Sequence, residues 1–457
     1  MSRRILHFLK SSSPHILNFI LVLALGVSAL SQRQGFSGSF NHPAIRYLDT
    51  PLHDAATELN QRLQDGRVQL TFEPGSGYLP SVLKALNIDV DSQVLVYSET
   101  SADAPRISRR NPRSIFFNDT TAVGWVRGGD VEMAAHDPRQ GVVFYVLKQV
   151  KAGKPRLERS QQCLRCHISW DTFGVPGMTM LSTGPPDPSG YATGGAIDDR
   201  TPFAERWGGW YVTGKPGAMR HMGNVPVELP MARRPSRPPI LDSLDGQFDR
   251  AGYLSPHSDI VALMVFEHQT RVMNLITYLG WEARVGHDVR AVARDLADAL
   301  LFTDEAPISG KIEGSSGFAA RFAALGPRDH LGRSLREFDL EHRLMRYPCS
   351  YMIYTPAFDA LPAAAKDEVY ARLWETLSGP EGRAVVEILK ETKRDLPSYF
   401  LTSPNPQLLK SVSVILEPVF FRLDVDRDVV ALRDGGFLLP LLVGGGLRLL
   451  GGADGEA

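Results

Sequence analysis

One short motif constrains this chain more than any other feature: Cys163-Leu164-Arg165-Cys166-His167, a Cys-x-x-Cys-His sequence. On one helical turn, two cysteines three residues apart face the same side. Their sulfurs can then bond to the two vinyl groups of a haem, and the histidine that follows can bind the iron. The motif predicts one covalent haem c, attached through Cys163 and Cys166, with His167 as the proximal iron ligand.

Two other chemistries use paired cysteines. A thioredoxin-like dithiol needs a βαβ setting, which Gln161-Gln162 and Ile168-Ser169-Trp170 do not provide. A structural zinc site needs two more ligands, commonly a second cysteine pair, and the sequence has none. Both remain as alternatives to the haem.

The N-terminus is typical of an export signal. Arg3, Arg4 and Lys10 precede an apolar stretch of 14 residues, Ile16–Ala29, that ends in small residues. A membrane-spanning helix needs about 20 apolar residues, so residues 1–29 are predicted to be a cleaved signal peptide. Uncleaved, they would anchor the protein to the membrane. Export to the periplasm agrees with haem attachment, and residues 30–49 are predicted to be a linker.

Charge and cysteine content narrow the possible partners. The formal net charge of −1 over 457 residues gives no basic excess for binding nucleic acid. An exported protein held by disulfides would carry more cysteines, in an even number, than the three found here. Cys349 lies among apolar residues and is predicted to be a buried, inert thiol.

The first part of the chain, residues 50–240, is predicted to mix helix and strand and to carry the haem motif. Helical spacing of apolar residues indicates a helix between Pro51 and Gly66. A hairpin is predicted around Asn118-Asp119-Thr120-Thr121. Strands are predicted at Val68–Phe72, Gln93–Ser98, Ser114–Phe117, Ala122–Val126, Val142–Leu147 and Trp207–Val212. The proline-rich run 230–239 should cross the surface without helix.

The second part, residues 250–400, is predicted to be mostly helical. A long helix should start at Ser255-Pro256 and continue to Trp281. Further helices are predicted at His287–Phe302, Phe318–Leu325, Ala363–Ser378 and Pro380–Arg394. Residues 401–457 are assigned to a C-terminal segment and tail. The fold class is therefore α+β, and not that of a minimal small cytochrome c.

The sixth iron ligand would decide between a carrier and a catalyst. His268 is the first candidate, because it shares an apolar helix face with Val261, Met264, Val272 and Leu275. A histidine there can equally be a hydrogen-bonded core residue. His221, in the loop Arg220-His221-Met222-Gly223-Asn224, is the second candidate, as a ligand or a distal acid–base group. The other histidine and methionine candidates are Met178, Met180, Met222, His257 and Met264.

Nearby residues suggest walls for a haem pocket. Trp207, Trp210 and Tyr211 could form an aromatic wall, or simply belong to the core. Arg206 and Arg220 could pair with haem propionates, because the guanidinium fork suits carboxylates.

Six stretches resemble a group of exported bacterial proteins described as containing a cytochrome c domain. They are 114–138, 163–167, Arg206–Gly214 (RWGGWYVTG), 220–224, 257–277 and 347–362. Together they span roughly residues 50 to 400. Similar sequences have Thr-His-Gly where this chain has Lys215-Pro216-Gly217, so a histidine is missing here. The resemblance implies haem and export and leaves the reaction open.

Two functions follow as hypotheses. The first is a periplasmic electron-transfer cytochrome that serves a redox partner protein of unknown identity. The second is a haem enzyme, peroxidase-like, with an open or displaceable sixth iron position and His221 or His268 as the distal acid–base residue. A haem-based sensor ranks below both, because no signalling domain is recognised in the sequence.

Overall fold

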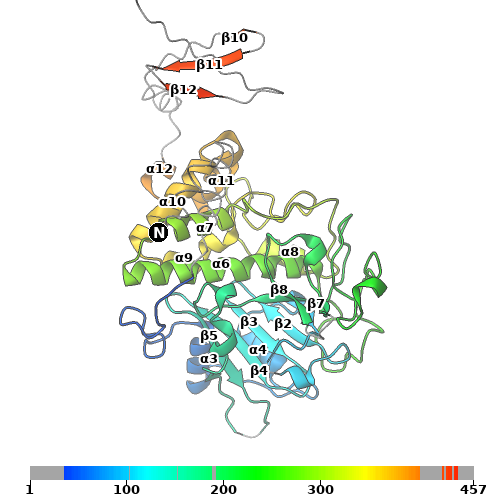
Figure 1. Ribbon diagram of the computed structural model, residues 1–457. Helices are drawn as coiled ribbons and strands as arrows, with labels where there is room; N and C mark the ends of the chain where they lie inside the picture. The colour runs from blue at the N-terminus through cyan, green and yellow to red at the C-terminus, as the bar shows by residue number, and fades with distance from the viewer. Residues whose placement is uncertain are drawn as a thin grey trace, which may run out of the picture. The chain divides into compact units, whose positions relative to one another are not determined.

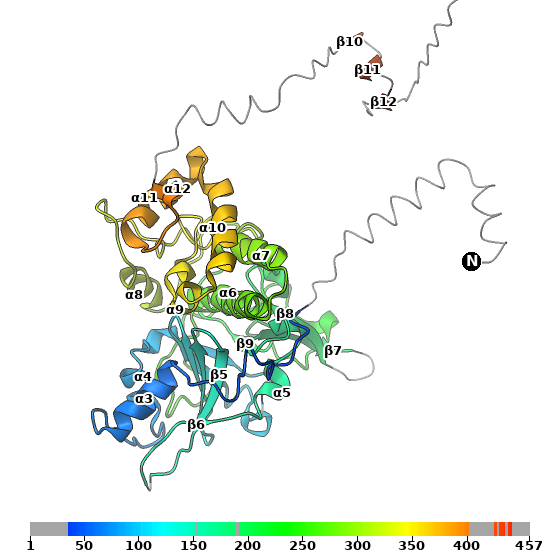
Figure 2. The same ribbon diagram turned by 90° about the vertical axis from the view of Figure 1, so that its left-hand side faces the viewer.

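The computed structural model describes residues 35–101, 103–151, 153–187, 192–401, 425–426, 429–434 and 437–440 (Figures 1 and 2). The predicted signal peptide, residues 1–29, the start of the linker and most of the C-terminal tail lie outside these residues. The chain divides into two compact units, residues 1–397 and 398–457. In the part of the chain described, no helix combines the length and apolar character needed to cross a membrane.

A seven-stranded antiparallel sheet forms one layer of the first unit. Its strand order is β6-β5-β4-β3-β2-β1-β9, so β2 to β6 follow one another as a meander and β9 joins the far edge from later in the chain. A meander needs only short turns, and the Asn118 carboxamide accepts the N–H groups of Thr120 and Thr121 in the turn between β2 and β3. The strands are β1 (Val94–Val96), β2 (Arg113–Phe117), β3 (Thr121–Trp125), β4 (Val131–Asp137), β5 (Gly141–Leu147), β6 (Glu158–Arg159) and β9 (Trp210–Tyr211).

The register of β4 and β5 defines the two faces of this sheet. Ala134 pairs with Phe144 and Met133 pairs with Tyr145, and neighbouring residues of a strand point to opposite faces. The helix α3 (Ala55–Gln64) covers the face of Tyr145, whose hydroxyl donates to the carboxylate of Asp54 at 2.6 Å. Asp54 is also the N-cap of α3 and accepts the N–H groups of Ala56 and Thr57.

The helix α6 (Ile260–Val285) covers the opposite face (Figures 1 and 2). His136, on the Phe144 face, contacts Thr277 of α6 at 2.9 Å, and Phe117 packs on Phe266 with ring centroids 4.7 Å apart. The helices α7 (Arg290–Leu300) and α10 (Ala363–Leu377) form a third layer beyond α6. Being enclosed between two layers, α6 is buried on nearly every side, polar residues included.

Shorter elements complete the chain. In the first unit they are α4 (Leu79–Ala85), α5 (Leu164–His167), β7 (Met180–Pro186), β8 (Ala192–Ile197), α8 (Phe318–Ala324), α9 (Pro356–Asp359) and α11 (Arg383–Thr392). Described by itself, the second unit contains α12 (Ser398–Leu401) and a three-stranded sheet of β10 (Val425–Asp426), β11 (Val429–Asp434) and β12 (Phe437–Pro440).

The α+β fold class is confirmed, and three local predictions are wrong. The run 230–239 does contain helix, since Met231–Arg233 forms a short 3-10 helix directly after Pro230. No strand forms at Val68–Phe72, because the hydroxyl of Ser81 bonds to both the N–H and the carbonyl of Thr71. The long helix begins at Ile260 rather than at Ser255-Pro256. Asp259 is its N-cap and accepts the N–H of Val261 at 2.8 Å.

Candidate functional site

The Cys-x-x-Cys-His motif forms one short helical turn, α5, with Cys163 at its N-cap. The N–H groups of Cys166 and His167 both bond to the carbonyl of Cys163, at 3.1 and 3.0 Å. This turn places the two cysteines on neighbouring positions of one face. Cys163 is half-buried, Cys166 is exposed, and both are free thiols. This turn is therefore compatible with the prediction that the two cysteines face the same side.

The ring of His167 is held in one orientation. It packs against Phe144 of β5 with centroids 4.5 Å apart, and its Nδ1 lies 2.9 Å from the carbonyl oxygen of Gly177. A carbonyl only accepts, so Nδ1 carries the proton and Nε2 keeps its lone pair. Burial lowers the pKa of His167 and favours this neutral form. A neutral ring fixed through Nδ1 is the arrangement that a histidine metal ligand needs.

The segment that carries Gly177 is itself tied at three points. The N–H of Gly177 donates to the carbonyl of His167 at 2.9 Å, and the carbonyl of Pro176 accepts the N–H of Val142. The carboxamide of Asn274, on α6, accepts the N–H of Met178 at 3.1 Å and donates to its carbonyl at 2.7 Å. The motif is thereby connected to both the sheet and α6, on the Phe144 face.

One ion pair lies next to the motif on this face. Arg113 and Glu132 are 2.5 Å apart and about one-fifth exposed. The side chain of Arg113 crosses Gly124, where a Cβ would come within 2.4 Å of its guanidinium. Burial raises the pKa of Cys163, while a hydrogen bond from its thiol to Ser160 has a smaller, opposite effect. Cys163 is accordingly a thiol and not an activated thiolate.

The structure does not place His268 as an available iron ligand. The side chain is fully buried, Nδ1 lies 2.9 Å from Asp199 and Nε2 lies 2.7 Å from the hydroxyl of Ser350. The ring also stacks on Phe302. Both nitrogens are used, so the core interpretation of His268 describes its surroundings better than the ligand interpretation.

Asp199, His268 and Ser350 form a buried chain that sequence spacing did not reveal. The same three residue types serve nucleophilic catalysis in hydrolases. Here Ser350 is fully buried, and its hydroxyl accepts the N–H of Met352 as a helix cap. Burial alone would raise the pKa of Asp199, but the ion pair with Arg271 at 2.9 Å and the hydrogen bond from His268 hold it well below its usual range. The chain stabilises the core and offers no nucleophile to solvent.

His221 is buried beside Trp207, with ring centroids 5.5 Å apart. Its Nδ1 accepts the N–H of Gly223 at 3.1 Å, and burial lowers its pKa to about 4. It is therefore a neutral buried imidazole rather than an exposed loop histidine. Trp210 and Tyr211 are buried too, and the indole of Trp210 donates to the carbonyl of Leu181.

Arg206 and Arg220, the two arginines predicted to pair with haem propionates, differ in burial. Arg206 is buried and donates to Glu267 at 2.8 Å and to the carbonyls of Thr201 and Asp199. All three nitrogens of its guanidinium group therefore already donate hydrogen bonds inside the protein. That prediction is wrong for Arg206. Arg220 is exposed. Of the methionine candidates, Met178, Met180 and Met264 are buried.

Within the described residues, no group of three or more His, Cys, Asp and Glu side chains is arranged to hold a metal ion. The zinc alternative therefore finds no ligand set in that part of the chain. No protein-family model, curated protein or solved structure matches the sequence.

Proposed function

We propose that this protein is an exported c-type cytochrome with one covalent haem on Cys163, Cys166 and His167. The observation that carries the proposal is the hydrogen bond from His167 Nδ1 to Gly177, which leaves Nε2 as a lone-pair donor beside two free thiols. A bound haem would supply one-electron chemistry at its iron. The chain's residues would attach it, orient the proximal ring and keep that ring neutral.

The thiol chemistry supports haem attachment over a redox dithiol. A dithiol oxidoreductase needs a nucleophilic cysteine with a lowered pKa. Burial moves the pKa of Cys163 in the opposite direction. Arg113, which pairs with Glu132, lowers the pKa of Cys163 by less than burial raises it.

Electron transfer is the activity that we propose for the haem. Cys166 is exposed and Cys163 is half-buried, so the residues that would attach the haem lie where a partner protein can approach them and exchange electrons. The alternative is a haem enzyme with an open sixth position. One observation favours it, because His268 would have to give up two hydrogen bonds to reach an iron.

The test is expression of the full chain with haem-attachment machinery, followed by oxidised and reduced absorption spectra of the exported fraction. We expect haem that stays with the denatured protein, and its loss in a Cys163→Ala/Cys166→Ala variant. Cys349→Ala is the matched control, because its thiol is fully buried elsewhere in the chain. Absence of haem bands from the wild-type protein contradicts the proposal.

The same spectra separate the two activities. Sharp reduced bands that added cyanide does not change indicate two axial ligands and electron transfer. A broad high-spin spectrum with rapid cyanide binding indicates an open position, and peroxide turnover then tests the enzyme hypothesis.

A further inference from the structure

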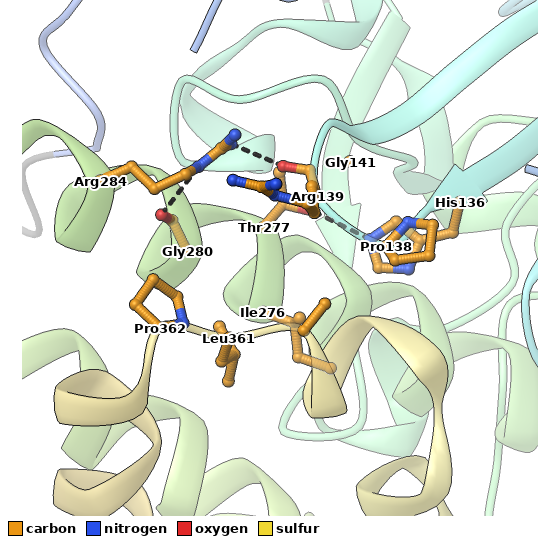
Figure 3. A pocket seen from close by; sticks show the side chains of 11 residues that line it. His136, Pro138, Arg139, Gly141, Ile276, Thr277, Gly280, Arg284, Leu361 and Pro362 are labelled. Atoms are coloured by element: carbon orange, nitrogen blue, oxygen red, sulfur yellow. Dashed lines mark hydrogen bonds between the residues drawn. The ribbon is translucent and has the colours of Figure 1, made fainter. Parts of the chain in front are cut away.

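A cavity of about 240 Å³ lies between the β4–β5 turn, α6 and the segment that follows α9 (Figure 3). Its walls include Arg139 on the turn, Arg284 and Gly280 on α6, and Leu361 with Pro362 on the third side. None of these residues belongs to the motif or to its supports.

Two arginines line the cavity, Arg139 and Arg284. Arg284 donates from Nε to the carbonyl of Gly280 at 3.3 Å and from its terminal nitrogen to the carbonyl of Arg139 at 2.5 Å (Figure 3). Among the described residues, no acidic side chain forms an ion pair with Arg139 or Arg284. Burial, followed by repulsion from Arg139, lowers the pKa of Arg284 to about 10, while attraction by Asp137 has a smaller, opposite effect.

The acidic side chain that attracts Arg284 is that of Asp137, at the end of β4. Its carboxylate accepts the backbone N–H groups of His53, Arg139 and Gln140 at 2.7 to 2.9 Å. A carboxylate that accepts three such bonds is well satisfied where it is. The two guanidinium groups therefore keep free donors, which an anion would satisfy.

The rest of the wall is apolar and leaves room. Ile276, Leu361 and Pro362 line it, and Gly280 lies beside Leu361. A Cβ at Gly280 would meet only Leu361, at an ordinary 3.5 Å. A glycine inside a helix costs about 1 kcal/mol relative to alanine, so the absence of a side chain here keeps volume at the expense of helix stability.

His136 adds an unpartnered acceptor to this wall. It is 5% exposed, and its Nε2 lies 2.9 Å from the hydroxyl of Thr277. That hydroxyl donates to the carbonyl of Met273, so the bond from His136 is donated by Nε2–H. Its buried Nδ1 has no hydrogen-bond partner and keeps its lone pair. His136 therefore brings no further charge to the cavity.

We propose that this cavity binds a small organic carboxylate, with the anionic group on Arg139 and Arg284 and a short apolar chain against Ile276 and Leu361. Guanidinium groups suit carboxylates through paired hydrogen bonds, and apolar walls select against fully hydrated inorganic anions. The proposal does not depend on the haem.

The test is calorimetric titration of the full chain with sodium butyrate, with sodium phosphate and sodium chloride as comparison anions. We expect saturable butyrate binding in the millimolar range, about tenfold weaker or absent in Arg284→Gln. Arg294→Gln, which removes an exposed arginine of α7 outside the cavity, should bind like the wild type.

A second variant separates lost binding from lost folding. Gly280→Leu fills the cavity and should abolish butyrate binding while the thermal unfolding midpoint stays close to that of the wild type. No butyrate binding by the wild type overturns the proposal. Equal binding by the wild type and Arg284→Gln overturns it too, as does binding of phosphate in preference to butyrate.

Discussion

The imidazole of His167 donates from Nδ1 to the carbonyl of Gly177, a residue only ten positions further along the chain. The local loop thus supplies the partner of the ring, and the partner is in turn held by Asn274 through the adjacent Met178. A residue of α6 thus supports the orientation of the predicted iron ligand through the backbone of Met178.

Asn274→Leu should weaken this support. The N–H and carbonyl of Met178 would lose their partners in a buried setting, at a cost of about 1–3 kcal/mol in the free energy of unfolding. Urea denaturation measures the change. Thr270→Val is the control on the same helix, because its buried hydroxyl has no partner to lose. Equal losses in the two variants would show that the two hydrogen bonds between Asn274 and the backbone of Met178, the clamp on Met178, contribute little to stability.

His268→Leu should destabilise the protein without changing the iron. The substitution removes one of the two hydrogen bonds of the Ser350 hydroxyl and leaves one oxygen of Asp199 unpaired in the core, so we expect a loss of about 2–4 kcal/mol in the free energy of unfolding. In haem-loaded protein the position and width of the reduced bands should stay unchanged. A shift to a high-spin spectrum in this variant would instead identify His268 as the sixth ligand.

The three cysteines should react at different rates in protein prepared without haem. Cys166 is exposed and should be alkylated first, followed by the half-buried Cys163. Cys349 should react only after denaturation, because it is fully buried and burial raises the pKa of its thiol to about 12. Iodoacetamide labelling with mass spectrometry gives the order. Rapid labelling of Cys349 in the native protein would contradict the packing described here.

Acid should destabilise the protein partly through His136. Burial lowers the pKa of His136 to about 4, from 6.5 in the unfolded chain, and Asp137 opposes this only weakly. The unfolded state therefore binds a proton first, so the stabilising contribution is complete above pH 6.5 and is lost as the pH falls to 4. Over that window the free energy of unfolding should fall by about 1.4 kcal/mol per pH unit.

A His136→Gln variant isolates this contribution. It cannot titrate, so its free energy of unfolding should depend less steeply on pH between 6.5 and 4, and chemical denaturation at several pH values measures both slopes. Parallel slopes for the wild type and the variant would mean that His136 is protonated in the folded state at these pH values.

Periodicity predicted most of the regular structure and missed what depends on distant partners. The hairpin at 118–121 and the helices α6, α7, α8, α10 and α11 lie where the pattern placed them, within a few residues. The strand β4 was not predicted, because Val131–Asp137 mixes charged and small residues and is stabilised by pairing with β3 and β5. The pattern at Val68–Phe72 favoured a strand, but this segment pairs with no strand among the described residues.

The local motif of the site could be predicted from the sequence, and the partners of His268 could not. Five adjacent residues are enough to recognise a Cys-x-x-Cys-His turn. The surroundings of His268 cannot be recognised from adjacent residues, because Asp199 lies 69 residues before it and Ser350 lies 82 residues after it. An apolar helix face indicates burial of a histidine but cannot say which polar groups meet it there.

The clamp on Met178 can form only late in the synthesis of the chain. Asn274 follows Met178 by 96 residues, so the clamp cannot close until α6 has been synthesised. The β2–β5 meander and the motif are complete long before that point, and neighbouring strands can pair as they emerge. A chemical modification of the motif therefore has its widest access early, before the arrival of α6 fixes the loop that positions His167.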